Sequence, residues 1–223
     1  MGFDMKWRTP PPELVHALDF ANAQIDAVRE QRDNAAPGSP EFALSVDLIR
    51  SLLVQKTQND SSQFHLNPWS MKWLVAFLLE TDMGYASRPL SGTPVPSTYG
   101  IDAADRNAFN DWLWGDLVLD AEFLPAKFVA CRDAIETFLA SSETPDEGIA
   151  LHKLATTNGW IVTPAECLSA LERYDNWLLE TGRPEDFAPW YIEDDGSKQI
   201  VEWWDDFIEY LIESAQHGGF VVN

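Results

Sequence analysis

Apolar side chains recur every three or four residues along most of this chain, and this spacing constrains the fold more than any other feature of the sequence. Leu14, Leu18, Ala21, Ile25 and Val28 fall on one side of a helical wheel. A stripe of this kind buries one face of an α-helix and leaves the other face in water. The spacing therefore predicts an amphipathic helix over this segment.

The same spacing predicts six further helices. Phe42, Val46, Ile49 and Leu53 form the apolar stripe of the second helix. The third segment, Trp69 to Leu79, is apolar on nearly every side, which is typical of a central buried helix. Four more helices are expected near residues 102–114, 125–141, 164–181 and 198–216.

Several helix starts share one short sequence pattern. A polar residue that can accept a backbone hydrogen bond precedes a proline, and proline suits the first position of a helix. The pattern occurs at Ser39-Pro40, Asn67-Pro68, Thr144-Pro145 and Thr163-Pro164. After the two threonines, Glu147 and Glu166 follow at the spacing of a capping box. Asp102 with Asp105 is a weaker version of the same signal.

Strand signals are few. Trp160-Ile161-Val162 follows the turn pair Asn158-Gly159, and Phe220-Val221-Val222 follows Gly218-Gly219. These two segments could pair, although nothing in the sequence fixes the pairing. We therefore predict a mainly α fold, an irregular multi-helix bundle with about seven helices and room for one small two-stranded ribbon.

The charge of the chain is strongly negative and unevenly distributed. The 223 residues fit a single helical domain over 1–223, and their formal net charge is −21. Residues 1–111 carry 9 basic and 14 acidic side chains, whereas residues 112–223 carry 6 basic and 22 acidic ones. The sequence thus indicates two subregions, a near-neutral 1–111 and a strongly acidic 112–223.

This charge restricts the partners that we expect. Phosphate backbones and anionic membranes repel a negative surface, so direct binding to nucleic acid or membrane is not expected. A basic protein partner is compatible with the charge, but solubility alone is a second explanation of the acidity. The longest apolar run, Leu74 to Leu79, is too short to span a bilayer, and Met1 to Pro12 is polar and proline-rich. We expect a cytoplasmic protein.

Sequence motifs of common enzymes and metal sites are absent. The chain contains no glycine-rich phosphate loop, no nucleophile elbow and no zinc-protease helix. Its histidines are scattered without the spacing of a local zinc site, at His16, His65, His152 and His217. Tyr191 to Glu202 matches an EF-hand loop only in part, because Tyr191 stands where the first carboxylate is needed. No metal and no cofactor is expected.

Cysteine and tryptophan are expected mainly in the interior. Cys131 and Cys167 lie far apart in apolar helical contexts, which predicts buried, reduced thiols. Ten tryptophans are present, and most of them should pack in the core because each buries a large apolar area.

Two aromatic-bearing segments lack helical periodicity and are the candidate binding loops. The first runs from Asp82 to Gly100, and the second from Arg183 to Ser197. Long loops in compact domains are commonly functional or mobile. The candidate binding residues in these loops are Tyr85, Arg88, Tyr99, Trp190, Tyr191, Asp194 and Asp195.

Two stretches resemble segments of actinobacterial proteins of unknown function. The first is Leu151-His152-Lys153-Leu154, which leads into the sequence NGWIVTP at 158–164. The second is His217-Gly218-Gly219-Phe220 near the end of the chain. The resemblance implies no activity and identifies no functional residue.

The absence of catalytic motifs, the two loops and the acidic half together favour a non-enzymatic binding or interaction protein with a basic protein partner. One alternative is an enzyme whose site is assembled from dispersed residues, for which His65, His152, Arg88 and the acids near Trp190 are candidates.

A second alternative is an inhibitor that mimics nucleic acid, with a row of carboxylates along the helix expected at 198–216. An ordinary amphipathic helix explains the same carboxylates, because Ile200, Trp204, Phe207 and Leu211 form an apolar stripe there.

Overall fold

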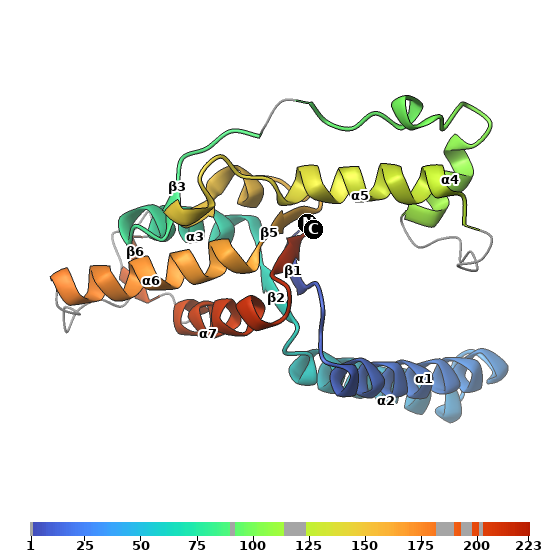
Figure 1. Cartoon of the computed structure of the whole chain (residues 1–223). Helices are drawn as coiled ribbons and strands as arrows, with labels where there is room; N and C mark the ends of the chain where they lie inside the picture. The colour runs from blue at the N-terminus through green and yellow to red at the C-terminus, as the bar shows by residue number, and fades with distance from the viewer. Residues whose placement is uncertain (1, 90–91, 114–123, 182–189, 193–197, 201–202) are drawn as a thin grey trace.

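The protein folds as seven α-helices and a small antiparallel sheet in the part of the chain that the computed structural model describes (Figure 1). That part comprises residues 2–89, 92–113, 124–181, 190–192, 198–200 and 203–223. The prediction of a mainly α fold is confirmed. The helices are α1 (Pro12–Asn34), α2 (Pro40–Asn59), α3 (Pro68–Glu80), α4 (Arg106–Leu113), α5 (Ala126–Ala140), α6 (Pro164–Thr181) and α7 (Trp203–Gln216).

The predicted helix caps at Ser39 and Asn67 are formed. Ser39 Oγ accepts a hydrogen bond from the Phe42 N–H at 3.2 Å, and Asn67 Oδ1 accepts one from the Ser70 N–H at 2.8 Å. Each bond satisfies one of the backbone donors that a helix start leaves open. The segment 164–181 is helical over the whole predicted range.

Four short strands form the central sheet in the order β2-β1-β8-β5, and all neighbours are antiparallel. The segments near 160 and 220, whose pairing the sequence left open, do pair, since Ile161 lies opposite Val221. The strands are β1 (Phe3–Trp7), β2 (Gln63–Leu66), β5 (Trp160–Val162) and β8 (Phe220–Val222).

The sheet is larger than a two-stranded ribbon because β1 and β2 extend it. Phe3, Met5 and Trp7 alternate with Asp4 and Lys6, which is the period of a strand. The prolines at 10–12 hide this short alternation in the sequence. β2 is only four residues long and follows the end of α2, where the α1–α2 hairpin returns to the sheet.

One face of the sheet packs on the main hydrophobic cluster. Met5, Phe220 and Val222 are completely buried in this cluster. Side chains of α3, α6 and α7 complete it, among them Leu74 and Phe207. The opposite face carries Lys6 and Val221 and is left partly open.

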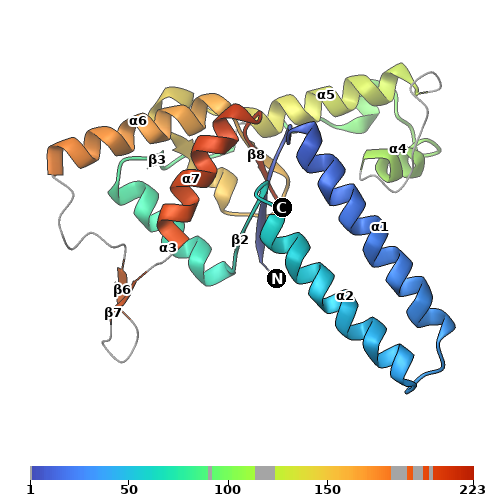
Figure 2. The same cartoon turned by 90° about the horizontal axis from the view of Figure 1, so that it is seen from below.

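The helices leave the sheet in different directions (Figures 1 and 2). In Figure 1, α6 and α7 extend to the left, while α5 and the α1–α2 hairpin extend to the right, above and below the sheet. The hairpin encloses its own small cluster of Ile25, Val28 and Ile49. A third cluster joins α4 and α5 around Phe109 and Phe128. That residues 1–223 form a single domain stays a prediction.

The predicted stripes of the first three helices are only partly correct. Ile25, Val28 and Ile49 are buried as expected, whereas Leu53 is 40% exposed. Leu52 packs against the hairpin cluster instead. α3 has a buried core face, but Trp69 is 55% exposed at its start, so the helix is not buried on all sides.

Three predicted boundaries differ from the structure. Asp102 Oδ1 accepts hydrogen bonds from the Ala104 and Asp105 N–H groups, and this turn delays the start of α4 to Arg106. Residues Lys198–Ile200 form strand β7, which pairs with β6 (Trp190–Ile192), so α7 begins at Trp203. Thr144 precedes a short 3-10 helix, η3 (Pro145–Glu147), rather than an α-helix.

The segment from 82 to 100 also contains short regular elements. Gly84–Tyr85 (β3) pairs in parallel with Ile149–Ala150 (β4), and Pro96–Tyr99 forms the 3-10 helix η1. A further 3-10 helix, η4 (Leu151–Leu154), follows β4 directly. The parallel β3–β4 pair places Met83, the residue before β3, beside Gly148, the residue before β4.

Cysteine and tryptophan lie largely where the sequence predicts. Cys131 and Cys167 are free and buried, and burial raises the pKa of both thiols. Of the eight tryptophans whose side chains the structure describes, only Trp69 is exposed. Across the described residues, no helix combines the length and the apolar character that a membrane span requires.

Candidate functional site

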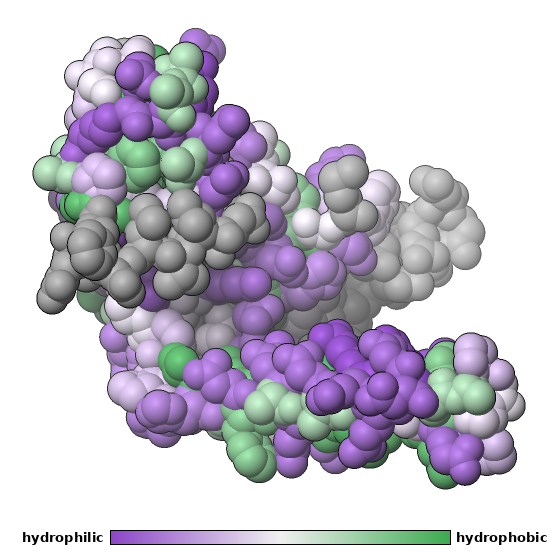
Figure 3. Space-filling view, turned by 90° about the vertical axis from the view of Figure 1, so that its right-hand side faces the viewer, coloured by the Kyte–Doolittle hydropathy of each residue, from purple (hydrophilic) through white to green (hydrophobic). Residues whose placement is uncertain are grey.

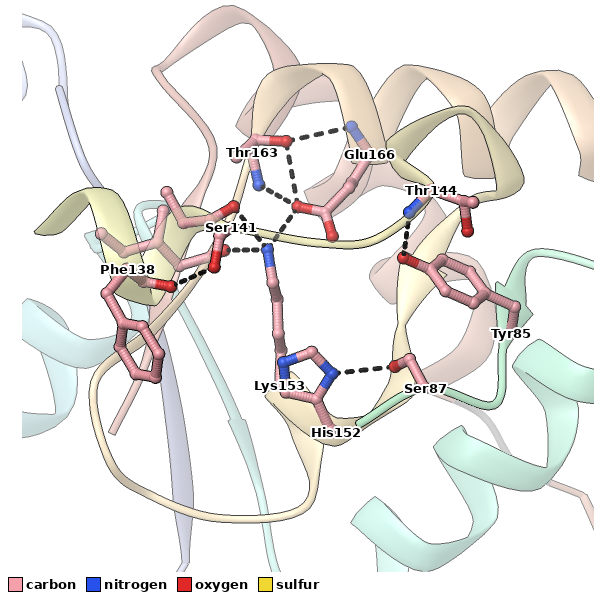
Figure 4. Close-up of polar contacts among 11 residues, drawn as sticks. Tyr85, Ser87, Phe138, Ser141, Thr144, His152, Lys153, Thr163 and Glu166 are labelled. Atoms are coloured by element: carbon pink, nitrogen blue, oxygen red, sulfur yellow. Dashed lines mark hydrogen bonds and ion pairs between the residues drawn. The ribbon is translucent and has the colours of Figure 1, made fainter. Parts of the chain in front are cut away.

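A buried lysine lies at the centre of the most connected polar cluster in the described structure (Figure 4). Lys153, in η4, has no exposed surface. Its ammonium donates to the carbonyl oxygens of Ala140 and Ile161 and to Glu166 Oε2, each at 2.8 Å. All three donors of the ammonium are therefore used, and they connect the end of α5, strand β5 and the first turn of α6.

Glu166 completes the predicted capping box at the start of α6. Its Oε2 accepts from the Thr163 N–H and the Thr163 hydroxyl, both at 2.9 Å. Thr163 Oγ1 accepts from the Glu166 N–H at 3.3 Å in return. One carboxylate oxygen thus caps the helix and binds the lysine, whereas Oε1 is buried without a hydrogen-bond partner among the described residues.

The Lys153–Glu166 pair is a structural connection rather than a reactive group. Burial lowers the pKa of the Lys153 ammonium from its ordinary 10.5, and the Glu166 carboxylate opposes that shift. Removing two charges from water costs several kcal/mol per ion, and only good geometry with additional hydrogen bonds offsets this cost. The two carbonyl oxygens supply those bonds.

His152 lies beside this pair and contacts the first candidate loop. Its Nδ1 is 2.8 Å from Ser87 Oγ, and the edge of its ring meets Trp160. Burial, with the nearby Lys153 charge, lowers the pKa of His152 below 6.5. The imidazole is therefore neutral near pH 7.

The Ser87–His152 contact has the form of a nucleophile and its base. His152 Nε2, however, is buried and has no hydrogen-bond partner among the described residues. A catalytic histidine needs a group that orients this second nitrogen. The contact therefore supplies two of the three parts of a triad, and its clear effect is to attach the loop at 87 to η4.

Tyr85 attaches the same loop to η3. Its hydroxyl oxygen accepts from the Thr144 N–H at 3.3 Å, and Thr144 Oγ1 bonds Glu147 Oε2 at 3.0 Å. Gly148 follows at φ 95°, and a Cβ there would lie 2.2 Å from the Met83 carbonyl oxygen. Only glycine allows so close an approach between the two segments. This approach places Asp146 next to α6.

An acidic hollow lies along α6, where η3 and the start of the loop meet it. Its volume is about 420 Å³. It is lined by Asp82, Asp146, Ser169, Glu172, Arg173, Asn176, Trp177 and Glu180. Four of these side chains are carboxylates, and three different segments of the chain contribute them.

Among the described residues, the one cation in the lining of the hollow is already neutralised. Arg173 forms an ion pair with Asp82, and Ser169 Oγ donates to the Asp146 carbonyl oxygen at 2.8 Å. Glu172 and Glu180 have no ion-pair partner in the described part of the chain and are exposed. The described lining of the hollow therefore carries more negative than positive charge.

Those predicted binding residues whose side chains the structure describes, Tyr85, Arg88 and Tyr99, do not line this hollow. Tyr85 is half-buried against Thr144, Arg88 is exposed, and Tyr99 packs on the α4–α5 cluster. Trp190 and Tyr191 lie in strand β6, whose side chains are not described. Asp194 and Asp195 lie outside the described residues. The role of these residues in binding stays a prediction.

The acids of the hollow had only a weak signal in the sequence. Glu172, Asn176 and Glu180 share a helical face through their spacing of four residues. Asp82 and Asp146, by contrast, arrive from separate loops and are brought there by the β3–β4 pair. Among 36 acidic residues, no local pattern distinguishes these two.

The remaining histidines do not assemble a site in the described structure. His65, on β2, bonds Asp4 through Nδ1 at 2.6 Å, and His217 stacks on Trp7 with ring centroids 4.5 Å apart. Within the described ranges, no group of three or more His, Cys, Asp or Glu side chains could hold a metal ion. The segment that partly matches an EF-hand loop covers β6, β7 and residues outside the described part of the chain.

No protein-family model, curated protein or solved structure matches this chain. The resemblance to actinobacterial proteins therefore stays a prediction. The function must be argued from the geometry of the hollow and the charge around it.

The buried ion pair yields a stability prediction. Lys153→Met leaves the Glu166 carboxylate buried without its cation, so the free energy of unfolding should fall by roughly 3–5 kcal/mol. Adding Glu166→Gln should recover part of this loss, because a neutral amide oxygen can still accept from Thr163. Chemical denaturation of the single and double variants measures both effects.

The control is Lys127→Met, which breaks the partly exposed pair with Asp105. It should cost no more than about 1 kcal/mol. Equal losses for the Lys153 and Lys127 variants would contradict the structural role of the buried pair.

A second prediction concerns pH. Because the pKa of His152 is lowered in the folded state, the unfolded state binds a proton that the folded state excludes below pH 6.5. Stability should therefore decrease as pH falls through 6.5, by at most about 1.4 kcal/mol per pH unit from this group. His152→Gln should flatten this part of the stability profile.

Denaturation midpoints between neutral and acidic pH test this expectation, with His16→Gln on the exposed side of α1 as the control. The account is contradicted if the His16 and His152 variants change the profile equally.

Proposed function

We propose that the protein is a non-enzymatic binding protein that holds a basic segment of a partner protein in the acidic hollow along α6. The observation that carries this proposal is the charge of the hollow. Four carboxylates line it, and the single cation among its described lining residues is paired with one of them. A lysine or arginine side chain of a partner would replace that missing positive charge.

The surroundings of the hollow favour a segment that is both basic and apolar. Leu168 and Leu179 are 59% and 82% exposed. They lie four residues before and seven residues after Glu172, so all three share one face of α6. Trp177 also lines the hollow, and an aromatic face can attract a cation. An amphipathic segment with basic and apolar side chains matches this combination of carboxylates and exposed leucines.

The nucleic-acid mimic has weaker support. α7 carries Asp205, Asp206, Glu209 and Glu213, but its Trp204, Phe207 and Leu211 are buried in the main cluster. Its carboxylates therefore follow from an ordinary amphipathic helix with one solvated face.

The enzyme alternative has one specific observation in its favour, the Ser87–His152 contact at 2.8 Å. An enzyme of this kind would need a group that orients His152 Nε2 and donors for a developing oxyanion. The described residues supply no hydrogen-bond partner to Nε2. Binding is the better supported function.

Removal of charge from the hollow tests the proposal. The probe is a short synthetic amphipathic peptide of lysine and leucine, titrated by calorimetry. The double variant Glu172→Gln, Glu180→Gln should weaken binding roughly 2- to 30-fold, since each exposed pair contributes about 0.2–1 kcal/mol. Raising the salt from about 0.1 to about 1 M should weaken the wild type too, as the Debye length falls to about 3 Å.

The matched control is Glu209→Gln with Glu213→Gln, which removes the same charge from the exposed face of α7. This variant should bind the peptide like the wild type. Equal weakening by the two double variants would mean that the peptide recognises only the overall negative charge, and the proposed site would then be wrong.

A further inference from the structure

A second cleft lies between α5 and the open face of the sheet. Its volume is about 670 Å³, within the range of small-molecule sites. Figure 3, a view from the right-hand side of Figure 1, shows the molecule hollowed between the α4–α5 part above and the α1–α2 hairpin below. The walls of the cleft belong to elements that border this hollow.

The floor of the cleft is a row of side chains across three strands. Lys6 of β1 lies opposite Val221 of β8, which lies opposite Ile161 of β5. Because neighbours in register share a face, all three belong to the face away from the main cluster. Ile135 and Leu139 of α5 add an apolar wall. The floor is thus apolar except at its Lys6 end.

Positive charge gathers at this cleft in a strongly negative protein. The lining includes Lys6, Arg8 and Arg132, three of the 15 basic residues of the chain, and among the described lining residues only Glu136 is acidic. Glu136 bonds Arg8 at 2.9 Å and lies 3.7 Å from Arg132. Arg132 also bonds Asp133 at 2.8 Å, so both guanidinium groups already have a carboxylate partner.

Lys6 is the cation most available to a ligand. Its side chain is exposed at the end of the apolar row, and no carboxylate pairs with it in the described part of the chain. The guanidinium of Arg132 is held over the Trp112 ring at 5.3 Å, which fixes its position beside the cleft. The cleft therefore combines an apolar floor, an ammonium without a carboxylate partner among the described residues, and two ordered guanidinium groups that carboxylates already pair.

From this combination we infer that the cleft binds a small amphipathic anion, with a carboxylate or phosphate head and an apolar body. The head pairs with Lys6 and the adjacent guanidinium groups, which bind carboxylates and phosphates well. The apolar body lies on Val221 and Ile161 and against Ile135 and Leu139, where it displaces water from apolar surface. A cationic amphiphile would bring like charges together and is excluded.

This site is independent of the acidic hollow. The hollow is lined by α6, η3 and Asp82, whereas the cleft is lined by the sheet, α5 and Thr93 and Pro94. The two surfaces select ligands of opposite charge. The candidate loop from 82 to 100 borders both, because it contributes Asp82 to one and Thr93 with Pro94 to the other.

The test uses dodecanoate, titrated below its micelle concentration into the full chain and followed by calorimetry and backbone amide shifts. Saturable binding is expected, with shifts at Lys6, Ile161 and Val221. Lys6→Gln should weaken it roughly 3- to 10-fold. Dodecyl phosphate should bind at the same residues, whereas inorganic phosphate, which lacks the apolar body, should bind far more weakly.

The control Arg50→Gln removes a cation from the exposed side of α2, outside the cleft, and should leave the affinity unchanged. Far-UV circular dichroism confirms that both variants are folded. Binding of dodecyltrimethylammonium as tight as that of dodecanoate, or an equal effect of the two variants, would overturn the inference. So would the absence of saturable dodecanoate binding by the wild type.

Discussion

The buried ammonium of Lys153 is the contact on which the arrangement of the rest depends. Its three hydrogen bonds join the last turn of α5, strand β5 and the capping box of α6. A lysine in this position is costly unless every donor is used, and here every donor is. The three segments are therefore held together by one side chain with a single satisfactory geometry.

Both candidate binding surfaces extend from this junction. The Ile161 carbonyl oxygen accepts a hydrogen bond from Lys153, and the Ile161 side chain forms part of the floor of the cleft. α6 starts at the capping box and carries Glu172 and Glu180 into the acidic hollow. One buried ion pair thus connects elements that contribute to both candidate surfaces.

Much of the fold follows from local sequence, and much of the candidate site does not. The apolar period and the Ser39, Asn67 and Thr163 caps predict helices because both act within a few residues. The sequence does not reveal β1 and β2, since a short strand depends on partners distant along the chain. Likewise, Lys198–Ile200 pairs with β6 although its spacing also suits a helix. Tertiary hydrogen bonding overrides propensity in such short segments.

The sites show the same limit. The Thr163–Glu166 capping box can be predicted from spacing alone, but nothing in the sequence shows that Lys153 is its buried partner, because lysine is rarely buried. Asp82 and Asp146 meet at α6 only through the β3–β4 pair and the close approach at Gly148. Charge totals predict an acidic surface without predicting where it is concave.

Amide hydrogen exchange of the Lys153→Met variant tests the central role of this junction most directly. The account predicts that protection decreases together at the end of α5, in β5 and in the first turn of α6. The α1–α2 hairpin, which has its own hydrophobic cluster, should keep its protection. A loss confined to η4, with the other three segments unchanged, would contradict the claim that Lys153 holds them together.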